Sequence, residues 1–199
     1  MAATSRRPDG RPTKVGRLHI TWEIVTGPRA GRGRGQVFGF GWFDSPFGDM
    51  LVLGDARDIV GLAFRGDGRR DDVLRAMQEH WPRAACRPHQ GTLSARVEAL
   101  CRTGAARVRL AGTERQLQVW AELLAIPKGE TRSYLDLARN LGTPRGAQWV
   151  GQANGANPIA WLVPCHRVIG TDGRIAGYAW GTALKRAMLE SEGVRLASG

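Results

Sequence analysis

Long hydrophobic runs are absent from this sequence. No apolar stretch in its 199 residues approaches the roughly 18 residues that a bilayer-spanning helix needs. The basic opening segment, residues 1–14, has no apolar stretch behind it and so lacks the pattern of a signal peptide. These absences argue against a membrane or secreted protein, and we expect a cytoplasmic one.

Cysteine is scarce, and an odd number of cysteines cannot all be paired. Cys86, Cys101 and Cys165 include no Cys-x-x-Cys doublet that could begin a metal cage. The nearest metal-like pair is Cys86 with His89, and two ligands do not make a closed zinc site; whether any zinc binds stays open. In a reducing compartment we expect free thiols, so a special role for one of them depends on its surroundings.

Acidic residues are outnumbered. There are 29 Lys and Arg against 18 Asp and Glu, which gives a net charge of +11. Residues 1–35 carry +6 of this, residues 36–110 carry +2 and residues 111–199 carry +3. Such a basic arm either adds sequence-independent attraction to nucleic acid or is a disordered, solubilising leader, and both alternatives stay open.

Glycine-rich and turn-forming segments divide the chain into three parts. Residues 1–36 form a leader, in which 27–35 have the glycine and arginine composition of a flexible linker and 18–25 alternate like a short strand. Residues 37–110 have the pattern of three strands followed by two helices, a small α+β module with no feature that suggests chemistry. Residues 111–199 form the third part.

The middle part is predicted to contain two helices and the cysteines Cys86 and Cys101. The first is predicted over 69–81, with acidic residues near its start, and the second over 93–104, with a glycine near its end. We predict that Cys101 packs within the second helix and that Cys86 lies in the loop between the two.

The third part is predicted to be mainly helical. Its expected helices are one that follows Thr113 as N-cap, one over 132–142, one over 143–157 with Thr143 as cap and Pro144 in its first position, and one over 181–193. The second and third are short helices joined by a tight turn that contains glycine, which resembles a helix-turn-helix.

The second helix of this pair is rich in glycine and alanine and therefore has few large side chains. Its small residues are Gly146, Ala147, Gly151, Ala153, Gly155 and Ala156. Glycine inside a helix costs about 0.5–1 kcal/mol relative to alanine, so another interaction must compensate. Close approach to a DNA groove and tight helix–helix packing both fit this composition.

The segment "NPIAWLVPCHRVIG" holds the candidate for chemistry. Cys165 follows an apolar run and a proline, and His166 comes directly after it. A nucleophilic cysteine must be a thiolate, which a nearby base favours. Neighbours in an extended chain point to opposite sides, so their contact needs a helical turn or a bridging water. Glu190 or Glu192 in the last helix would orient the imidazole.

Two long stretches resemble one protein family. "VPCHRVIGTDGRIAGYAWG" and "GTERQLQVWAELLAIPKGETRSYLDLARNLG" are similar to the alkylguanine-DNA alkyltransferases, or methylated-DNA–protein-cysteine methyltransferases, over about residues 111–193. "DSPFGDMLVLGDARDIVGLAF" resembles the family's N-terminal domain more loosely. The resemblance implies an α+β fold: a small ribonuclease-H-like N-terminal domain and a mainly helical C-terminal domain with a winged-helix-like helix-turn-helix.

The resemblance also implies catalytic roles. Cys165 corresponds to the acceptor thiolate that attacks the alkyl carbon on guanine O6. His166 resembles the base that takes the thiol proton through a water, and Glu192 the carboxylate that holds this histidine. Asn157 corresponds to a residue that braces the turn before the site, and Tyr134 to the tyrosine that stabilises the departing guanine.

The substrate and DNA contacts follow from the same motifs. Tyr178 resembles a pocket-wall residue beside the base and its alkyl group, and Val163 and Pro164 are assigned to the same pocket. By resemblance the second helix of the pair enters the minor groove of double-stranded DNA. The DNA-binding positions are then Arg145, Ala147, Gln148, Trp149, Gly151 and Asn154.

The sequence departs from the family pattern at two places. The recognition helix of the family usually carries an arginine that fills the gap left by a flipped nucleotide, and this chain has Gln148 there. Trp149 or Arg145 would partly substitute for the missing charge. Arg115 stands where the family generally has an aromatic residue, which puts the packing around it in question.

These features together predict a DNA repair protein. It would flip the damaged nucleotide and transfer the alkyl group from O6-alkylguanine in double-stranded DNA to Cys165, once per chain, as a nucleoid-associated monomer without metal or other cofactor. Two alternatives are a non-catalytic protein that binds and flags alkyl lesions and a DNA-binding regulator that responds to alkylation.

Overall fold

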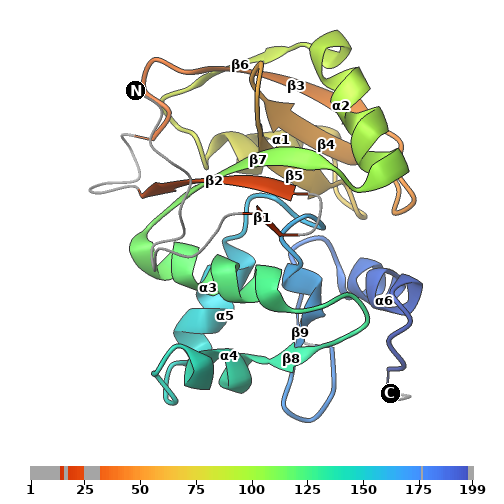
Figure 1. Ribbon diagram of the computed structural model, residues 1–199. Coiled ribbons are helices and arrows are strands. Elements are labelled where there is room, and N and C mark those ends of the chain that lie inside the picture. Colours follow the sequence, from red (N-terminus) through yellow and green to blue (C-terminus); the bar gives the residue numbers. More distant parts are fainter. Residues whose placement is uncertain (1–13, 16–17, 25–31, 176, 197–199) are drawn as a thin grey trace.

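A seven-stranded mixed sheet and a group of helices pack against each other (Figure 1). The computed structural model describes residues 14–15, 18–24, 32–175 and 177–196. In the view of Figure 1 the sheet, with helices α1 and α2, forms the upper half, and helices α3 to α6 form the lower half. The candidate chemistry lies in the lower half.

The sheet has the order β1-β2-β7-β5-β4-β3-β6. Its strands are β1 (Lys14–Val15), β2 (Leu18–Ile24), β3 (Val37–Phe43), β4 (Met50–Gly54), β5 (Ile59–Phe64), β6 (Ala85–Pro88) and β7 (Ala106–Gly112). β3, β4 and β5 form an antiparallel meander, and every residue of β4 and β5 is buried. The predicted turns separate them: Gly48 has a φ of +91°, and the Asp55 carboxylate accepts from the backbone N–H groups of Arg57 and Asp58.

The two predicted helices of this half are confirmed. They are α1 (Arg70–Gln78) and α2 (Gln90–Thr103), and α2 ends at Gly104, whose φ of 67° is the left-handed conformation that glycine adopts without strain. The prediction that Cys86 lies in a loop is wrong, because it lies in β6, which pairs with β3. Cys101 lies in α2 as predicted, but its side chain is exposed and not packed.

The N-terminal segment contributes to the sheet. β2 pairs with β7 in parallel over its whole length, from Leu18 opposite Ala106 to Ile24 opposite Gly112, and Ile20 is fully buried. Of the expected linker over 27–35, residues 27–31 lie outside the described residues and 32–35 form a turn. A boundary at residue 110 would cut β7, which ends at Gly112.

The helical half contains the four predicted helices and two short strands that were not predicted. Its elements are α3 (Glu114–Ala125), β8 (Arg132–Ser133), α4 (Tyr134–Asn140), α5 (Ala147–Gly155), β9 (Val168–Ile169) and α6 (Thr182–Ser191). Thr113 caps α3 in a reciprocal capping box with Gln116, as predicted. The predicted start of α5 is wrong: Thr143 and Pro144 lie in the turn before it, because the Thr143 hydroxyl donates to Ala138 O instead of capping a helix.

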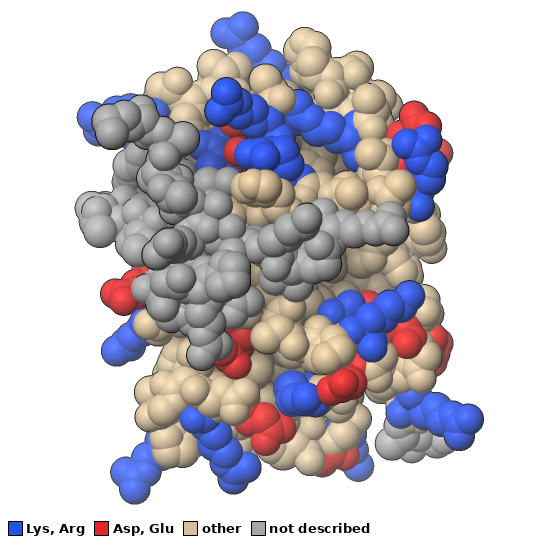
Figure 2. Space-filling view, in the orientation of Figure 1, with Lys and Arg blue, Asp and Glu red and all other residues tan. Residues whose placement is uncertain are grey.

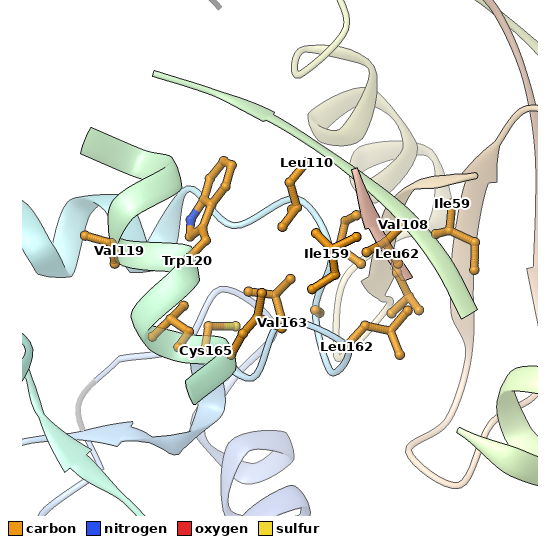
Figure 3. Packing of buried hydrophobic residues seen from close by; sticks show 14 of the residues in the cluster. Ile59, Leu62, Val108, Leu110, Val119, Trp120, Ile159, Leu162, Val163 and Cys165 are labelled. Atoms are coloured by element: carbon orange, nitrogen blue, oxygen red, sulfur yellow. The ribbon is translucent and has the colours of Figure 1, made fainter. Parts of the chain in front are cut away.

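The two halves share one hydrophobic core. Leu62 in β5 forms a parallel bridge with Ile159, through Leu62 N–H to Pro158 O and Ala160 N–H to Leu62 O, both at 2.9 Å. Figure 3 shows side chains of β5, β7, α3 and the segment before Cys165 meeting in this core. The segment that leads to the cysteine is therefore fixed on a central strand of the sheet.

Charge is distributed unevenly over the surface. On the face shown in Figure 2, Lys and Arg side chains gather over the upper half, whereas basic and acidic side chains are interleaved over the lower half. Among the described residues, none of the helices combines the length and apolarity needed to cross a membrane.

Candidate active site

Cys165 begins a single turn of 3-10 helix, Cys165–Arg167, which follows Pro164. Its side chain is 2% exposed, and its sulfur lies at the edge of the shared core beside α3 (Figure 3). The helical turn replaces the extended chain in which Cys165 and His166 would point to opposite sides. Val163 and Pro164, which were assigned to the substrate pocket, are buried directly before the cysteine.

Asn157 ties down the segment that carries the cysteine. Its side-chain amide donates to Val163 O at 2.9 Å, and its side-chain oxygen accepts from the Ile159 N–H at 3.0 Å. Within the loop closed in this way, Trp161 has a φ of 65°, a conformation that non-glycine residues adopt only when the surrounding contacts enforce it. The structure thus places Asn157 where a brace of this turn would lie.

His166 is held by a carboxylate on the last helix. Its Nε2 lies 3.2 Å from Oε1 of Glu192, the residue that caps the C-terminus of α6. Arg167 binds the same carboxylate in a bidentate manner, Nε to Oε2 at 2.8 Å and Nη2 to Oε1 at 2.7 Å. Glu190, the other residue considered for this role, is exposed.

The electrostatics of this triad keep the carboxylate charged and the imidazole neutral. Burial raises the pKa of Glu192, but hydrogen bonds and charge from His166 and Arg167 outweigh it and bring the pKa down to about 2. Burial lowers the pKa of His166 in spite of Glu192. The buried Nδ1 of His166 makes no hydrogen bond to the described residues, so a neutral ring nitrogen is ready to accept a proton.

The thiol of Cys165 is protonated in this resting arrangement. Burial raises its pKa, while hydrogen bonding with Asn157 and Tyr178 and the charge of Lys185 act in the opposite direction. The Cys165 Sγ donates toward the Tyr178 hydroxyl at 3.8 Å, and this hydroxyl donates in turn to Met188 Sδ at 3.6 Å. Forming the thiolate therefore requires a base close by.

Lys185 belongs to the site and was missed in the sequence. It is 0% exposed, and its Nζ donates to Val168 O at 2.6 Å and lies 5.9 Å from the centre of the Tyr178 ring. Burial lowers its pKa to about 8, against the influence of Cys165. A possible signal was its place in α6 three residues before Met188, on the helix face that is buried.

Tyr134 lies at the start of α4, which packs against α5. Burial and the proximity of Cys165 raise its pKa, so the phenol keeps its proton.

The glycines of α5 have room for a side chain. A Cβ added at Gly151 would lie 3.7 Å from the Tyr134 ring, which is ordinary contact, and one added at Gly155 would meet nothing within 4 Å. At these two positions of α5 helix–helix packing does not require glycine.

Most residues predicted to bind DNA are at least partly accessible. Arg145 and Gln148 are exposed, and Ala147, Trp149 and Gly151 are half-buried. Asn154 is the exception: it is 6% exposed, and its side-chain amide lies 3.5 Å from Cys165 O. Its assignment to the DNA surface is wrong, because the side chain faces the cysteine turn.

In the described part of the chain, no group of three or more His, Cys, Asp and Glu side chains is arranged to hold a metal ion. The polar groups around Cys165 instead bind one another or the backbone.

A buried thiol, a neutral histidine and a carboxylate that orients it define a protein with a cysteine nucleophile. Comparison with known proteins identifies the family. Residues 114–194 match the family model described as 6-O-methylguanine DNA methyltransferase, DNA binding domain. A methylated-DNA–protein-cysteine methyltransferase of Methanosarcina acetivorans is 38% identical over 155 residues, which cover 76% of this chain and 96% of the relative.

Relatives and solved structures from Mycobacterium tuberculosis agree. The methylated-DNA–protein-cysteine methyltransferase of that organism is 39% identical over 156 residues, 75% of this chain and 88% of the relative. Its crystal structure superimposes with a TM-score of 0.61 at 34% identity, over 81% of this chain and 96% of that one, and a structure in complex with DNA gives 0.60 over 79% and 93%. The chain belongs to the methylated-DNA–protein-cysteine methyltransferase family.

Proposed function

We propose that this protein repairs DNA by moving the alkyl group of O6-alkylguanine to the sulfur of Cys165, once per chain. The observation that carries the proposal is the buried cysteine beside a neutral histidine that a charged carboxylate holds, in a chain of this family. A protein that only flags lesions needs none of these groups, whereas a regulator that is itself alkylated on the cysteine would share them.

The transfer is a displacement at carbon. The thiol proton moves to the free Nδ1 of His166, through a water, and the His166 imidazolium is stabilised by Glu192. The thiolate then forms a bond to the alkyl carbon while the bond from that carbon to guanine O6 breaks, and its electron pair stays on the guanine. The product thioether is stable, so the cysteine is consumed and no cofactor takes part.

Several neighbours assist this step. The Tyr134 hydroxyl, which keeps its proton, donates to the guanine as it gains negative charge. Tyr178 touches both the sulfur and the buried Lys185, so it forms the wall against which the base and the alkyl group lie. Asn157 holds the turn that aims the sulfur.

The substrate must leave the DNA stack to reach a buried sulfur. Guanine O6 lies within the duplex, so the nucleotide is flipped into the site. The α4–α5 pair acts as a helix-turn-helix of winged-helix type, and α5 enters the minor groove of double-stranded DNA. The bare positions Gly151 and Gly155 support this, because they let the DNA backbone approach the helix closely.

The remaining architecture is proposed on the same basis. The meander β3-β4-β5 with β7 beside it supports a ribonuclease-H-like domain over about residues 37–112, and residues 113–199 form the DNA-binding alkyltransferase domain. Residues 1–36 form a basic leader that includes β1 and β2. The protein works as a monomer in the cytoplasm, at the nucleoid.

A mass measurement tests the function directly. The wild-type protein, incubated with a duplex that contains one O6-methylguanine, should gain one methyl group on the peptide that contains Cys165. Cys165→Ala should gain none and keep its affinity for the duplex. A wild-type protein that binds the duplex and stays unmodified would favour the flagging protein instead.

A further inference from the structure

The arginines of the helical half between α3 and α5 differ in how they are used. Arg132 pairs with Glu130 at 2.8 Å, and Arg139 pairs with Asp136 at 3.7 Å. Arg115 and Arg145 are exposed and form no ion pair with the described residues. Within the described residues, these two positive charges therefore have no acidic partner within ion-pair distance.

Arg115 is held in place by an aromatic ring. Its guanidinium carbon lies 5.9 Å from the centre of the Trp149 ring, within the range of a cation–π contact. Arg115 is in the first turn of α3 and Trp149 in the first turn of α5, two helices that pack on each other (Figure 1). This stacked pair fills the place where a family aromatic was expected and answers the question about its packing.

The position of the indole depends on a glycine. A Cβ at Gly146, the N-cap of α5, would collide with Trp149 Nε1 and lie 2.8 Å from Thr143 O. The indole therefore rests directly on the backbone of the turn. Trp149 is also packed against the shared core on its other side, so the platform under Arg115 is rigid.

Arg115 and Arg145 line the same hollow. This hollow, about 670 Å³ in volume, lies between the start of α3 and the turn before α5. It contains no acidic side chain, and its lining residues are Arg115, Gln118, Leu141, Thr143, Pro144, Arg145, Gly146 and Trp149. Gln148, the neutral residue at the start of α5, is exposed beside it.

We propose that this hollow binds a phosphate of the DNA backbone, with Arg115 and Arg145 as its ligands and Trp149 as the residue that positions Arg115. The proposal rests on the proposed function, since it places the DNA along α5. Guanidinium groups match phosphate oxygens in geometry and charge. A cation supplied from α3 then adds positive charge near the neutral Gln148, without taking the place of a side chain that fills the gap left by the flipped nucleotide.

The choice of a backbone phosphate follows from the shape and position of the hollow. It lies at the N-terminal end of α5, away from Cys165, so its ligand is not the reacting base. Side chains that contact phosphates fix the register of a protein on DNA without reading sequence. Arg115 and Arg145 are therefore expected to strengthen binding to damaged and undamaged duplexes equally.

Salt-dependent binding tests this assignment. The affinity of a fluorescent 16-base-pair undamaged duplex is measured from about 50 to 300 mM salt for wild type, Arg115→Gln and Arg145→Gln. Each variant should bind about 3- to 10-fold more weakly at 100 mM salt, and the slope of log K against log salt should fall by about 1 in magnitude. Arg102→Gln on α2, which removes the same charge from an exposed pair with Glu98, is the matched control and should leave the slope unchanged.

The positioning role of Trp149 has its own readout. Trp149→Leu should weaken binding as Arg115→Gln does, and the double variant should be no weaker than either single one, since the residues act as a unit. Trp149→Phe keeps a ring and should restore part of the affinity; thermal unfolding identifies any loss of folding. The proposal is overturned if the slope of log K against log salt is the same for Arg115→Gln as for Arg102→Gln. Wild type that binds with the full slope yet accepts no methyl group would instead overturn the proposed function.

Discussion

Glu192 binds a neutral imidazole and a guanidinium cation at once, and this arrangement decides the protonation state of the site. Its carboxylate accepts from His166 and from the guanidinium of Arg167, and Arg167 also donates to Ile126 O. A carboxylate that faces a fixed positive charge remains ionised when it is buried. Because Arg167 supplies that charge permanently, the histidine is free to be neutral and to accept the thiol proton.

We expect Glu192→Gln to slow methyl transfer at least tenfold and to lower the free energy of unfolding at pH 7 by roughly 3 kcal/mol, since it leaves a buried cation without its partner. The ordinary pKa of Glu192 is 4.5 and its folded pKa is about 2. Its contribution to stability is therefore complete above about pH 4.5 and is lost as the pH falls toward 2.

Urea unfolding at a series of pH values measures this prediction. The difference between wild type and Glu192→Gln should be constant from pH 7 to 5 and should shrink between pH 4.5 and 2. Glu190→Gln, on the exposed side of the same helix, is the control and should change stability by less than about 0.5 kcal/mol. A difference that does not depend on pH would show that Glu192 carries no lowered pKa.

Tyr134→Phe should reduce the rate of methyl transfer about 100-fold at saturating duplex, because the departing guanine loses a hydrogen-bond donor. Affinity for undamaged duplex should stay the same, since the change removes one half-buried hydroxyl. Single-turnover quenching and a binding titration give the two values. A transfer rate within twofold of wild type would remove Tyr134 from the reaction.

At the scale of elements, the turn between α4 and α5 is held by several short-range contacts. Thr143 closes it with a hydrogen bond to Ala138 O, and its backbone carbonyl accepts from the Gly146 N–H at 2.7 Å. The Trp149 indole covers it. Three contacts of short range thus fix where α5 begins and how its accessible face is turned.

Gly146→Ala should destabilise the protein by roughly 1–3 kcal/mol, because the new methyl group collides with backbone and indole together. It should also weaken DNA binding through the displaced Trp149. Gly155→Ala is the matched control on the same helix, where a Cβ meets nothing, and should be neutral or stabilise by about 0.5 kcal/mol. Thermal unfolding compares the two; equal effects would contradict the role of the indole.

At the scale of the whole molecule, the N-terminal segment is part of the fold. β2 continues the sheet beyond β7, and Ile20 is buried in the core that also contains Cys165. The N-terminal segment, which carries the greatest excess of positive charge, therefore also contributes to the stability of the globular part.

Deletion of residues 1–13, which stops before β1, should leave the midpoint of urea unfolding unchanged. Deletion of residues 1–35 removes β2 and should lower the free energy of unfolding by roughly 3 kcal/mol or more, since the buried Ile20 and the ladder with β7 are lost. Equal midpoints for the two deletions would mean that β2 contributes nothing to stability.

The sequence by itself determined the features whose causes lie within a few residues. The N-cap at Thr113, the glycine that ends α2 and the turns that separate β3, β4 and β5 depend on neighbours in the chain. The motif around Cys165 was likewise contiguous, and it pointed to the family that the relatives confirm. Each of these is readable because local hydrogen bonds and side-chain periodicity are encoded locally.

Only the tertiary structure decided the features that depend on distant segments. β7 and β6 were not predicted, because a short strand gains its hydrogen bonds from partners far away in the chain. The inward turn of Asn154 and the burial of Lys185 depend on how α5 and α6 are rotated against the cysteine turn. The stacking of Arg115 on Trp149 joins two helices that begin more than 30 residues apart, and no local pattern records such a contact.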